Sequence, residues 1–290
     1  MEWRGRRQSG NIEDRRAEGS SGGGGFSRRG GVGVGGGLGV LAIVVVGWFF
    51  GVDLTPLLNS GGGSGVTQST GASAPDPAAG EFVGVTLGDT EEVWAKVFKE
   101  QVGAAYHPVT LVLYSGVTQS PCGDASGATG PFYCPGDKKV YLDTDFFNTL
   151  AQELGAKGDF AMAYVVAHEV GHHVQDELGI LGKANKIRSK VSDAQSNAIS
   201  VRIELQADCF AGIWGRDAQA QFGSIDPGDF EEAVNAAKKI GDDTLQRNAG
   251  QVPSPDSFTH GTSAQRSKWF QIGLKSGQIA ACDTFSPQNP

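Results

Sequence analysis

The chain of 290 residues has no lysine or arginine between Arg29 and Lys96, and no cysteine before Cys122. Without an early cysteine there is no place for a lipid-modified anchor near the N-terminus. Basic residues are also the minority overall, since 24 Lys and Arg stand against 32 Asp and Glu for a net charge of −8. An acidic chain of this kind argues against nucleic acid as the main partner.

One long apolar run interrupts the Gly- and Ser-rich N-terminal part. It covers residues 32–54, has no charge before Asp53, and follows all seven early arginines. As a helix it is long enough to span roughly 30 Å of hydrocarbon. The positive-inside rule then predicts a single-pass cell-membrane anchor with a cytoplasmic N-terminus. A cleaved signal peptide is the alternative, although its only acceptable site, residues 72–74, lies far beyond the apolar core. A buried core helix is less favoured because the flanks are so polar.

Composition divides the chain into four parts. Residues 1–31 are predicted to be a disordered Arg- and Gly-rich cytoplasmic tail, and residues 32–54 the transmembrane signal anchor. Residues 55–80 are rich in Gly, Ser and Pro and are predicted to form a flexible linker. Residues 81–286 have a globular composition, and roughly 200 residues suffice for a core and a cleft.

All four cysteines lie in this globular part, which the topology places outside the cytoplasm. Four cysteines in an exported domain indicate two disulfides, with three possible connectivities. The loop between Cys122 and Cys134 is short and rich in Gly and Pro, so we pair these two. Cys209 with Cys282 follows by elimination. Buried free thiols are the alternative, while the spacing argues against a four-cysteine zinc knuckle.

Helical patterns dominate the globular part after a few early strands. Strands are expected at residues 110–114, 131–134 and 139–142, and helices at residues 90–103, 143–155, 160–178, 193–215, 226–240 and 262–277. The last helix begins with a capping box formed by Thr262 and Gln265. This pattern predicts an α+β fold, mainly helical with a small sheet.

The segment HEVGHHVQ contains His168, Glu169 and His172 in the order His-Glu-x-x-His. Positions i and i+4 share one face of a helix, so the two imidazoles can bind one Zn²⁺ from adjacent turns. Glu169 lies one position on, where its carboxylate can take a proton from water at the open metal position. The competing interpretation is a helix with a surface glutamate and partly buried histidines.

A catalytic zinc site needs a third protein ligand, and no further histidine follows at a suitable spacing. Glu204, in VRIELQADCFAG, is the better candidate, because its neighbours are small and apolar. Asp208 lies one turn later, where a carboxylate can orient a ligating imidazole. A charged pair on a solvated helix face is the alternative.

The two helical motifs together resemble the thermolysin-like clan of zinc peptidases. Residues Glu81–Phe285 more closely resemble the bacterial neutral zinc metallopeptidase family, through GPFYCPGDKKVYLD, VVAHEVGHHVQ, RIELQADCFAG and HGTSAQRSKWF, together with the Arg-rich tail and membrane segment. The resemblance implies Zn²⁺ on His168, His172 and Glu204, Glu169 as general base, and Asp208 as a residue that orients a ligand. It also implies that the strand containing Tyr141 binds substrate.

The remaining histidines receive weaker assignments. His260 precedes the last helix, where it can hydrogen-bond the oxyanion formed during attack on a carbonyl, or simply cap or pack the helix start. His173 points about 100° away from the ligand face and is expected to be structural. His107, before a strand, receives no function.

The sequence therefore predicts a membrane-anchored zinc endopeptidase acting on extracytoplasmic proteins or peptides. A non-catalytic zinc-binding scaffold is a second hypothesis, although such a site needs no base and usually has four protein ligands. A zinc hydrolase acting on cell-wall peptides is a third.

Overall fold

The computed structural model describes residues 1–17, 76–126, 130–156, 158–226 and 228–286. The predicted membrane anchor at residues 32–54 lies outside the described residues, as do residues 18–31 and 55–75 of the predicted tail and linker. Within the described ranges, no helix is both long enough and apolar enough to cross a membrane.

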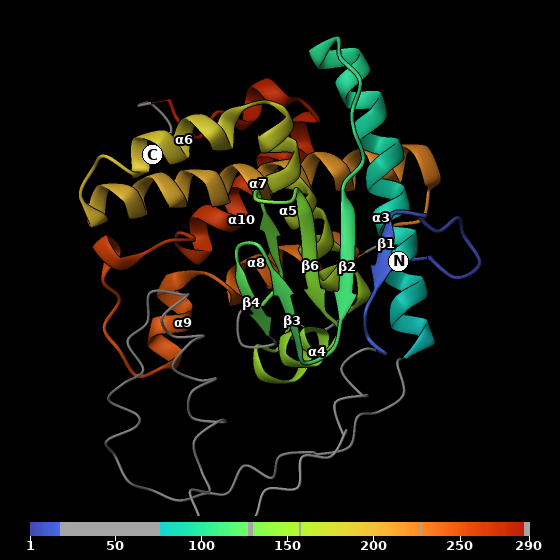
Figure 1. The fold of residues 1–290 in the computed structure, drawn as a ribbon, viewed down its shortest axis with the longest axis horizontal. Helices are drawn as coiled ribbons and strands as arrows, with labels where there is room; N and C mark the ends of the chain where they lie inside the picture. The colour runs from blue at the N-terminus through green and yellow to red at the C-terminus, as the bar shows by residue number, and fades with distance from the viewer. Residues whose placement is uncertain (18–75, 127–129, 157, 227, 287–290) are drawn as a thin grey trace, which may run out of the picture.

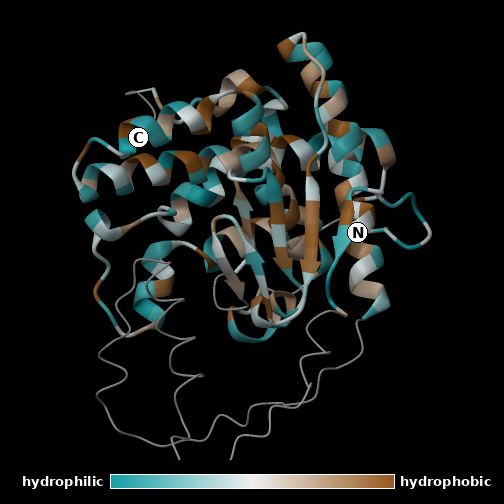
Figure 2. Ribbon diagram, viewed as in Figure 1, coloured by the Kyte–Doolittle hydropathy of each residue, from teal (hydrophilic) through white to brown (hydrophobic). Residues whose placement is uncertain are grey.

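A four-stranded sheet forms the centre of the molecule, in the order β1-β2-β6-β5 (Figure 1). β2 (Thr110–Tyr114) is parallel to both β1 (Ile12–Asp14) and β6 (Lys139–Asp143), whereas β5 (Phe132–Cys134) is antiparallel to β6. The apolar strands β2 and β6 are the most hydrophobic part of the sheet (Figure 2). The strands expected around residues 110–114, 131–134 and 139–142 are confirmed.

A two-stranded hairpin, β3 (Val117–Ser120) and β4 (Gly123–Ser126), lies in front of this sheet in Figure 1. The sequence pattern did not reveal it, because its alternation is weak and its residues are mostly polar. Ala125 of β4 is buried in a small cluster with Val112, Tyr114, Cys134 and Tyr141. The Cys122–Cys134 disulfide ties the hairpin to β5, which confirms the first predicted pair.

Helices pack behind the sheet and around it (Figure 1). They are α3 (Pro77–Val97), continued by a π-helical turn at Phe98–Val102; α4 (Asp145–Asn148), continued by a π-helical turn at Thr149–Glu153; α5 (Asp159–Glu177); α6 (Ile180–Arg188); α7 (Asp193–Phe222); α8 (Asp229–Lys239); α9 (Asp242–Asn248); and α10 (Ser263–Ser276). Short 3₁₀ turns lie at Pro255–Ser257 and Ile279–Cys282. The expected mainly helical α+β fold is confirmed.

Two glycines allow α7 and α10 to pack closely. A Cβ atom built on Gly212 would lie 2.1 Å from the Phe270 carbonyl oxygen, and one on Gly273 would lie 1.8 Å from that of Cys209. The second disulfide, Cys209–Cys282, fastens the C-terminal segment to α7 and confirms the second predicted pair.

Residues 1–17 differ from the sequence prediction of a disordered tail over residues 1–31. β1 pairs with β2, and the backbone N–H of Ser9 donates to Gly84 O on α3 at 2.8 Å. Trp3 is buried and packs edge-on against Phe82, with ring centroids 5.6 Å apart. The Arg-rich composition is used here in ion pairs, which the disorder prediction ignored. The folded part also begins before residue 81, because α3 starts at Pro77.

Candidate metal centre

Helices α5 and α7 pack face to face and carry the predicted ligands. Gly171 makes the approach close, since a Cβ atom there would lie 3.1 Å from the Ala207 carbonyl oxygen. His168 and His172 project from successive turns of α5, and Glu204 projects from α7. The structure thus brings together three residues that the sequence places in two separate motifs.

The three side chains converge on one point. Nε2 of His168 lies 3.1 Å from Oε2 of Glu204, and Nε2 of His172 lies 3.5 Å from Oε1 of the same carboxylate. One ligand atom from each residue falls within 4.8 Å of the others. In a tetrahedral zinc site with bonds of about 2.1 Å, neighbouring ligand atoms are about 3.4 Å apart. The spacing of these donors therefore fits Zn²⁺.

The second ring nitrogen of each histidine has its own acceptor. His168 Nδ1 lies 2.9 Å from Oδ1 of Asp208, and His172 Nδ1 donates to Oε1 of Gln175 at 2.9 Å. Each Nδ1 then carries the proton, and each Nε2 presents a lone pair toward the Glu204 carboxylate. Lone pairs facing a carboxylate repel it unless a cation lies between them, so the donor set itself fits a metal ion.

The electrostatics of His168 lead to the same conclusion. Burial lowers the pKa of this imidazole, but the Asp208 and Glu204 carboxylates outweigh burial and raise the pKa to about 10. Burial likewise opposes ionisation of Glu204, yet the neighbouring imidazoles of His172 and His168 hold its pKa well below the usual range. An environment that favours an imidazolium also favours a metal cation at the same place.

Asp208 stands at the centre of a buried network that the sequence did not reveal. Arg266 of α10 binds both of its oxygens, with Nε to Oδ2 and Nη2 to Oδ1 each at 2.9 Å. The Tyr164 hydroxyl also donates to Oδ1, and all three side chains are at most 2 % exposed. Arg266 belongs to the segment HGTSAQRSKWF, but the residues around it give no sign of a partner on another helix.

Glu169 lies beside the ligands rather than among them. Its side chain is buried, and Oε2 has no hydrogen-bond partner within the part of the chain that the structure describes. Burial raises the pKa of this carboxyl, although the nearby His172 and His168 partly oppose the shift. A carboxylate with raised proton affinity and an unused oxygen has the properties of a general base.

His260 is held beside Asp242, the first residue of α9. Its Nδ1 lies 3.2 Å from Oδ1 of Asp242. The backbone N–H groups of Thr259, His260 and Gly261 all donate to Oδ2 of that aspartate, at 2.8, 2.7 and 2.9 Å. His260 also contributes, after His172 and His168, to holding the pKa of Glu204 below its usual range. Asp242 was not among the predicted residues, because a lone Asp at a helix start has no special signal.

The other residues considered from sequence lie away from the ligands. His173 Nε2 donates to the His107 carbonyl oxygen at 2.7 Å and its ring packs on Tyr106 and Tyr133, consistent with a structural role. The His107 side chain is exposed and lies 2.7 Å from Glu177. Tyr141 lies in β6, which is paired on both sides, so it has no free edge for substrate. In the described sheet the edge strands are β1 and β5.

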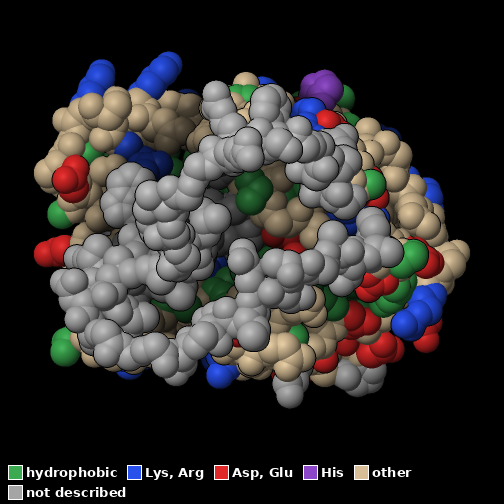
Figure 3. Space-filling model, turned by 60° about the horizontal axis from the view of Figure 1, so that its bottom comes forward, with side chains coloured by type: hydrophobic (Ala, Val, Ile, Leu, Met, Phe, Trp, Pro, Cys, Tyr) green, Lys and Arg blue, Asp and Glu red, His purple; other side chains and the backbone are tan. Residues whose placement is uncertain are grey.

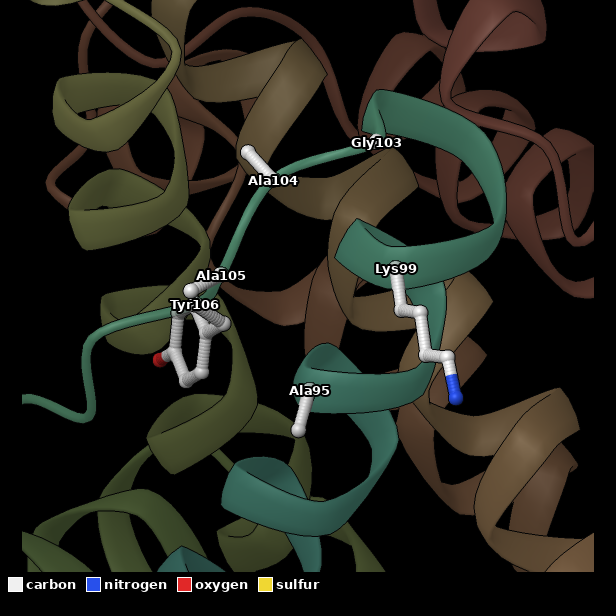
Figure 4. Close-up of a pocket in the computed structure, with 6 residues that line it drawn as sticks. All are labelled: Ala95, Lys99, Gly103, Ala104, Ala105 and Tyr106. Atoms are coloured by element: carbon white, nitrogen blue, oxygen red, sulfur yellow. The ribbon is translucent and has the colours of Figure 1, made fainter.

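Two further features lie outside this cluster. Asp159, Asp229 and Glu232 also lie close enough together for a metal, but the Met1 ammonium fills this cluster, 3.1 Å from Asp159 and 3.0 Å from Asp229. A shallow pocket of about 500 Å³ opens between α3 and the segment leading to β2 (Figure 4). Its lining is Ala95, Lys99, Gly103, Ala104, Ala105 and Tyr106. It includes none of the converging ligands.

Acidic side chains gather on one side of the face shown in Figure 3. This agrees with the net charge of −8. A negative surface concentrates cations rather than nucleic acid near the molecule.

Between these two helices, two histidines and one carboxylate lie close enough together to hold a metal ion, and they are the ligand types that zinc sites use. Over residues 1–285 the chain matches the family described as "Putative neutral zinc metallopeptidase", and it belongs to this family. It is 48% identical over 289 residues to "Uncharacterized protein YpfJ" of Escherichia coli strain K12, covering 98% of this chain and 99% of that protein. It is 46% identical over 185 residues to "Uncharacterized protein Rv2575" of Mycobacterium tuberculosis strain H37Rv, covering 60% and 61%. No solved structure matches the chain.

Proposed function

We propose that the protein is a zinc endopeptidase in which His168, His172 and Glu204 hold the metal. The observation that carries this proposal is the convergence of two imidazole Nε2 atoms on one carboxylate, with a buried, unpartnered glutamate beside them. A structural zinc site would need a fourth ligand and no base. Within the described residues the cluster contains three ligand-type side chains, which favours catalysis over the scaffold hypothesis.

Each residue has a separate task in this proposal. His168, His172 and Glu204 would hold Zn²⁺, which would supply a Lewis acid for a peptide carbonyl and for water. Glu169 takes the proton from the attacking water and delivers it to the leaving amine. Asp208 and Gln175 hold the two imidazoles with Nδ1 protonated, so that both Nε2 lone pairs face the metal.

His260 is proposed to stabilise the oxyanion that develops on the attacked carbonyl. Asp242 accepts from Nδ1 when that nitrogen is protonated and fixes the ring, while three backbone N–H groups hold Asp242 in turn. A donor fixed in advance stabilises developing charge without reorganisation, and losing one such donor costs about 10²–10³ in kcat.

The substrate is proposed to be an unfolded protein or peptide outside the cytoplasm. Two disulfides in the domain favour an oxidising compartment. The apolar run at residues 32–54 is proposed to hold the protein at the cell membrane. Cleavage of cell-wall peptides is the alternative activity, and comparing unfolded casein with cell-wall fragments as substrates separates the two.

Two matched variants test the mechanism. Glu169→Gln is expected to keep about one equivalent of zinc after dialysis while peptide cleavage falls by roughly 10²-fold or more, because only the base is lost. Glu204→Gln is expected to lose zinc and activity together, because it removes a charged ligand. A fully active Glu169→Gln enzyme would rule out the proposed base, and a Glu204→Gln enzyme with full zinc would place the third ligand elsewhere.

A further inference from the structure

A chain of buried amides connects the ligand His172 to the C-terminal disulfide. Gln175 accepts from His172 Nδ1 with its oxygen, and its nitrogen donates to Ile203 O at 2.7 Å and to Gln206 Oε1 at 3.1 Å. The Gln206 nitrogen in turn donates to Cys282 O at 2.8 Å. Every polar group along this path has a partner, and both glutamines are at most 5 % exposed.

The far end of this chain is fixed to α7 from several directions. Cys282 forms its disulfide with Cys209 of α7, one turn after Gln206. The Thr284 hydroxyl donates to Arg202 O at 2.6 Å, and Arg202 donates to Phe285 O at 2.9 Å. The C-terminal segment therefore cannot shift without disturbing the acceptor on which Gln206 depends.

The amide orientation follows from this arrangement. Cys282 O is an acceptor only, so Gln206 must present its nitrogen to it and its oxygen to Gln175. Gln175 must then present its nitrogen to Gln206 and Ile203 O, which leaves only its oxygen for His172. We infer that Gln175 and Gln206 are positioning residues that set the metal-binding tautomer of His172. The Cys209–Cys282 disulfide holds Cys282 O, the acceptor for Gln206, in its position.

This inference rests on the proposed metal centre, but its test does not need peptidase activity. Zinc affinity is measured on the full chain by competition with a chromogenic chelator. Gln175→Met removes the acceptor and is expected to weaken zinc binding by about 10- to 100-fold. Gln175→Glu keeps an acceptor for Nδ1 but turns a carboxylate oxygen toward Ile203 O and Gln206 Oε1, so it is expected to recover only part of that loss. In the metal-free protein, at a pH high enough to keep the His172 ring neutral, its nitrogen NMR shifts should show Nδ1 protonated in the native chain and a tautomer mixture in Gln175→Met.

The two disulfides provide a matched control. Replacing Cys209 and Cys282 by Ser, or Gln206 by Met, is expected to weaken zinc binding several-fold. Replacing Cys122 and Cys134 by Ser is expected to leave zinc affinity unchanged, because that bridge lies at the hairpin. Native zinc affinity in Gln175→Met, or in both Gln206→Met and the Cys209/Cys282 variant, would overturn the inference. A protein that binds zinc as expected but cleaves no peptide would instead refute the proposed function.

The described segments that precede and follow residues 18–75 contact each other. The N-terminal arm, defined here as residues 1–17, is part of the folded domain. Arg6 makes two hydrogen bonds of 2.8 Å to Asp89, which is 4 % exposed, and the backbone N–H of Arg15 donates to Leu113 O at 2.7 Å. Arg16 Nη1 donates to Asp76 O at 2.7 Å, so the chain leaves and re-enters the domain at one place.

We propose that the N-terminal arm and the metal centre share one compartment. A single membrane crossing within residues 32–54 would put the N-terminal arm and α3 on opposite sides, and none of these contacts could form. The contacts and the single-crossing topology predicted from the arginines therefore exclude each other.

Single cysteines on the full chain test this proposal, because the four native cysteines are in disulfides. Gly10 and Gly182 are both exposed, and a Cβ atom at either position meets nothing within 4 Å. Gly10→Cys and Gly182→Cys are treated with a membrane-impermeant maleimide in intact and in lysed bacterial cells. Equal labelling of both sites before lysis, whether present or absent, supports a shared compartment. Labelling of only one site before lysis would overturn it.

Discussion

Arg266 is the cation on which the buried carboxylate of Asp208 depends. Both oxygens of Asp208 bind this guanidinium, and the two side chains are at most 2 % exposed. Arg266→Gln leaves a buried charge without its partner, so the free energy of unfolding is expected to fall by about 3–5 kcal/mol. Urea unfolding of the metal-free protein measures this effect.

The exposed pair Arg247–Asp243 is the matched control, because the same substitution there removes a helical ion pair at the surface. Arg247→Gln is expected to cost at most about 0.5 kcal/mol. Equal losses in the two variants would show that the Asp208 network contributes no more than a surface pair.

Asp143 provides a pH-dependent prediction. It is fully buried at the end of β6, and burial raises its pKa to about 6. The backbone N–H of Asp145 donates to its carboxylate and partly opposes this increase. Between the ordinary carboxyl pKa and about 6 the folded state binds more protons than the unfolded state. The contribution of Asp143 to the free energy of unfolding therefore falls as the pH rises through that window, and it stays low at higher pH.

Asp143→Asn keeps the acceptor for the Asp145 N–H and removes the charge. Its unfolding free energy is expected to exceed that of the native protein by about 2–3 kcal/mol at pH 8, with no difference below about pH 4. Denaturant midpoints across this pH range check the prediction, and a constant difference at all pH values would contradict it.

Among individual residues, the sequence predicted those that share one short helical motif. His168, Glu169 and His172 share one helical motif, and Glu204 with Asp208 share another. Arg266 and Asp242 were missed because each acquires its role only from a residue in another segment, and no spacing in the chain reports such contacts. Gln175 was missed although it lies three residues after His172 on α5, because its other partners, Ile203 and Gln206, are on α7.

Among the elements, the crossing of α7 and α10 is the most constrained. Gly273→Ala would place a Cβ atom 1.8 Å from the Cys209 carbonyl oxygen, so the helices must separate. We expect a loss of about 3 kcal/mol or more in unfolding free energy. Zinc affinity should fall as well, because α7 carries Glu204 and α10 carries Arg266.

Gly182→Ala is the control for this substitution. Gly182 lies on exposed α6, and a Cβ atom there meets nothing within 4 Å. Alanine is the better helix former, so this variant is expected to be more stable by roughly 0.5–1 kcal/mol. A similar change of the same sign in both variants would contradict the proposed helix contact.

Helices and strands were predicted correctly where the residues that start and end them lie within the same segment. The capping box of Thr262 and Gln265 and the glycine at 277 bound α10 as expected. β1 was missed because Ile12, Glu13 and Asp14 are too short a segment to show a strand pattern and become a strand only beside β2. The helix expected from residue 90 begins at Pro77; residues 76–80 were assigned to the linker, and residues 81–89 were not recognised as part of the helix.

For the whole molecule, metal binding should add stability. A ligand that binds only the folded state at 100 times its Kd stabilises it by about 2.7 kcal/mol. A chelator is therefore expected to lower the Tm of the native protein and to leave the Tm of Glu204→Gln unchanged. Glu232→Gln, in the acidic cluster occupied by Met1, should respond to the chelator like the native protein. A lost response in Glu232→Gln alone would place the metal at that cluster.

The docking of the N-terminal arm also sets an order of folding. Ile12 pairs with Leu111, and the Met1 ammonium contacts Asp229, 228 positions away in the sequence. Contacts between such distant segments form late, because the intervening chain must first be closed into a loop. During synthesis the arm emerges before β2, α5 and α8 and must wait for them. The arm is thus among the last of the described segments to fold, and until then β2 has an unpaired edge that a chaperone or a second nascent chain can occupy.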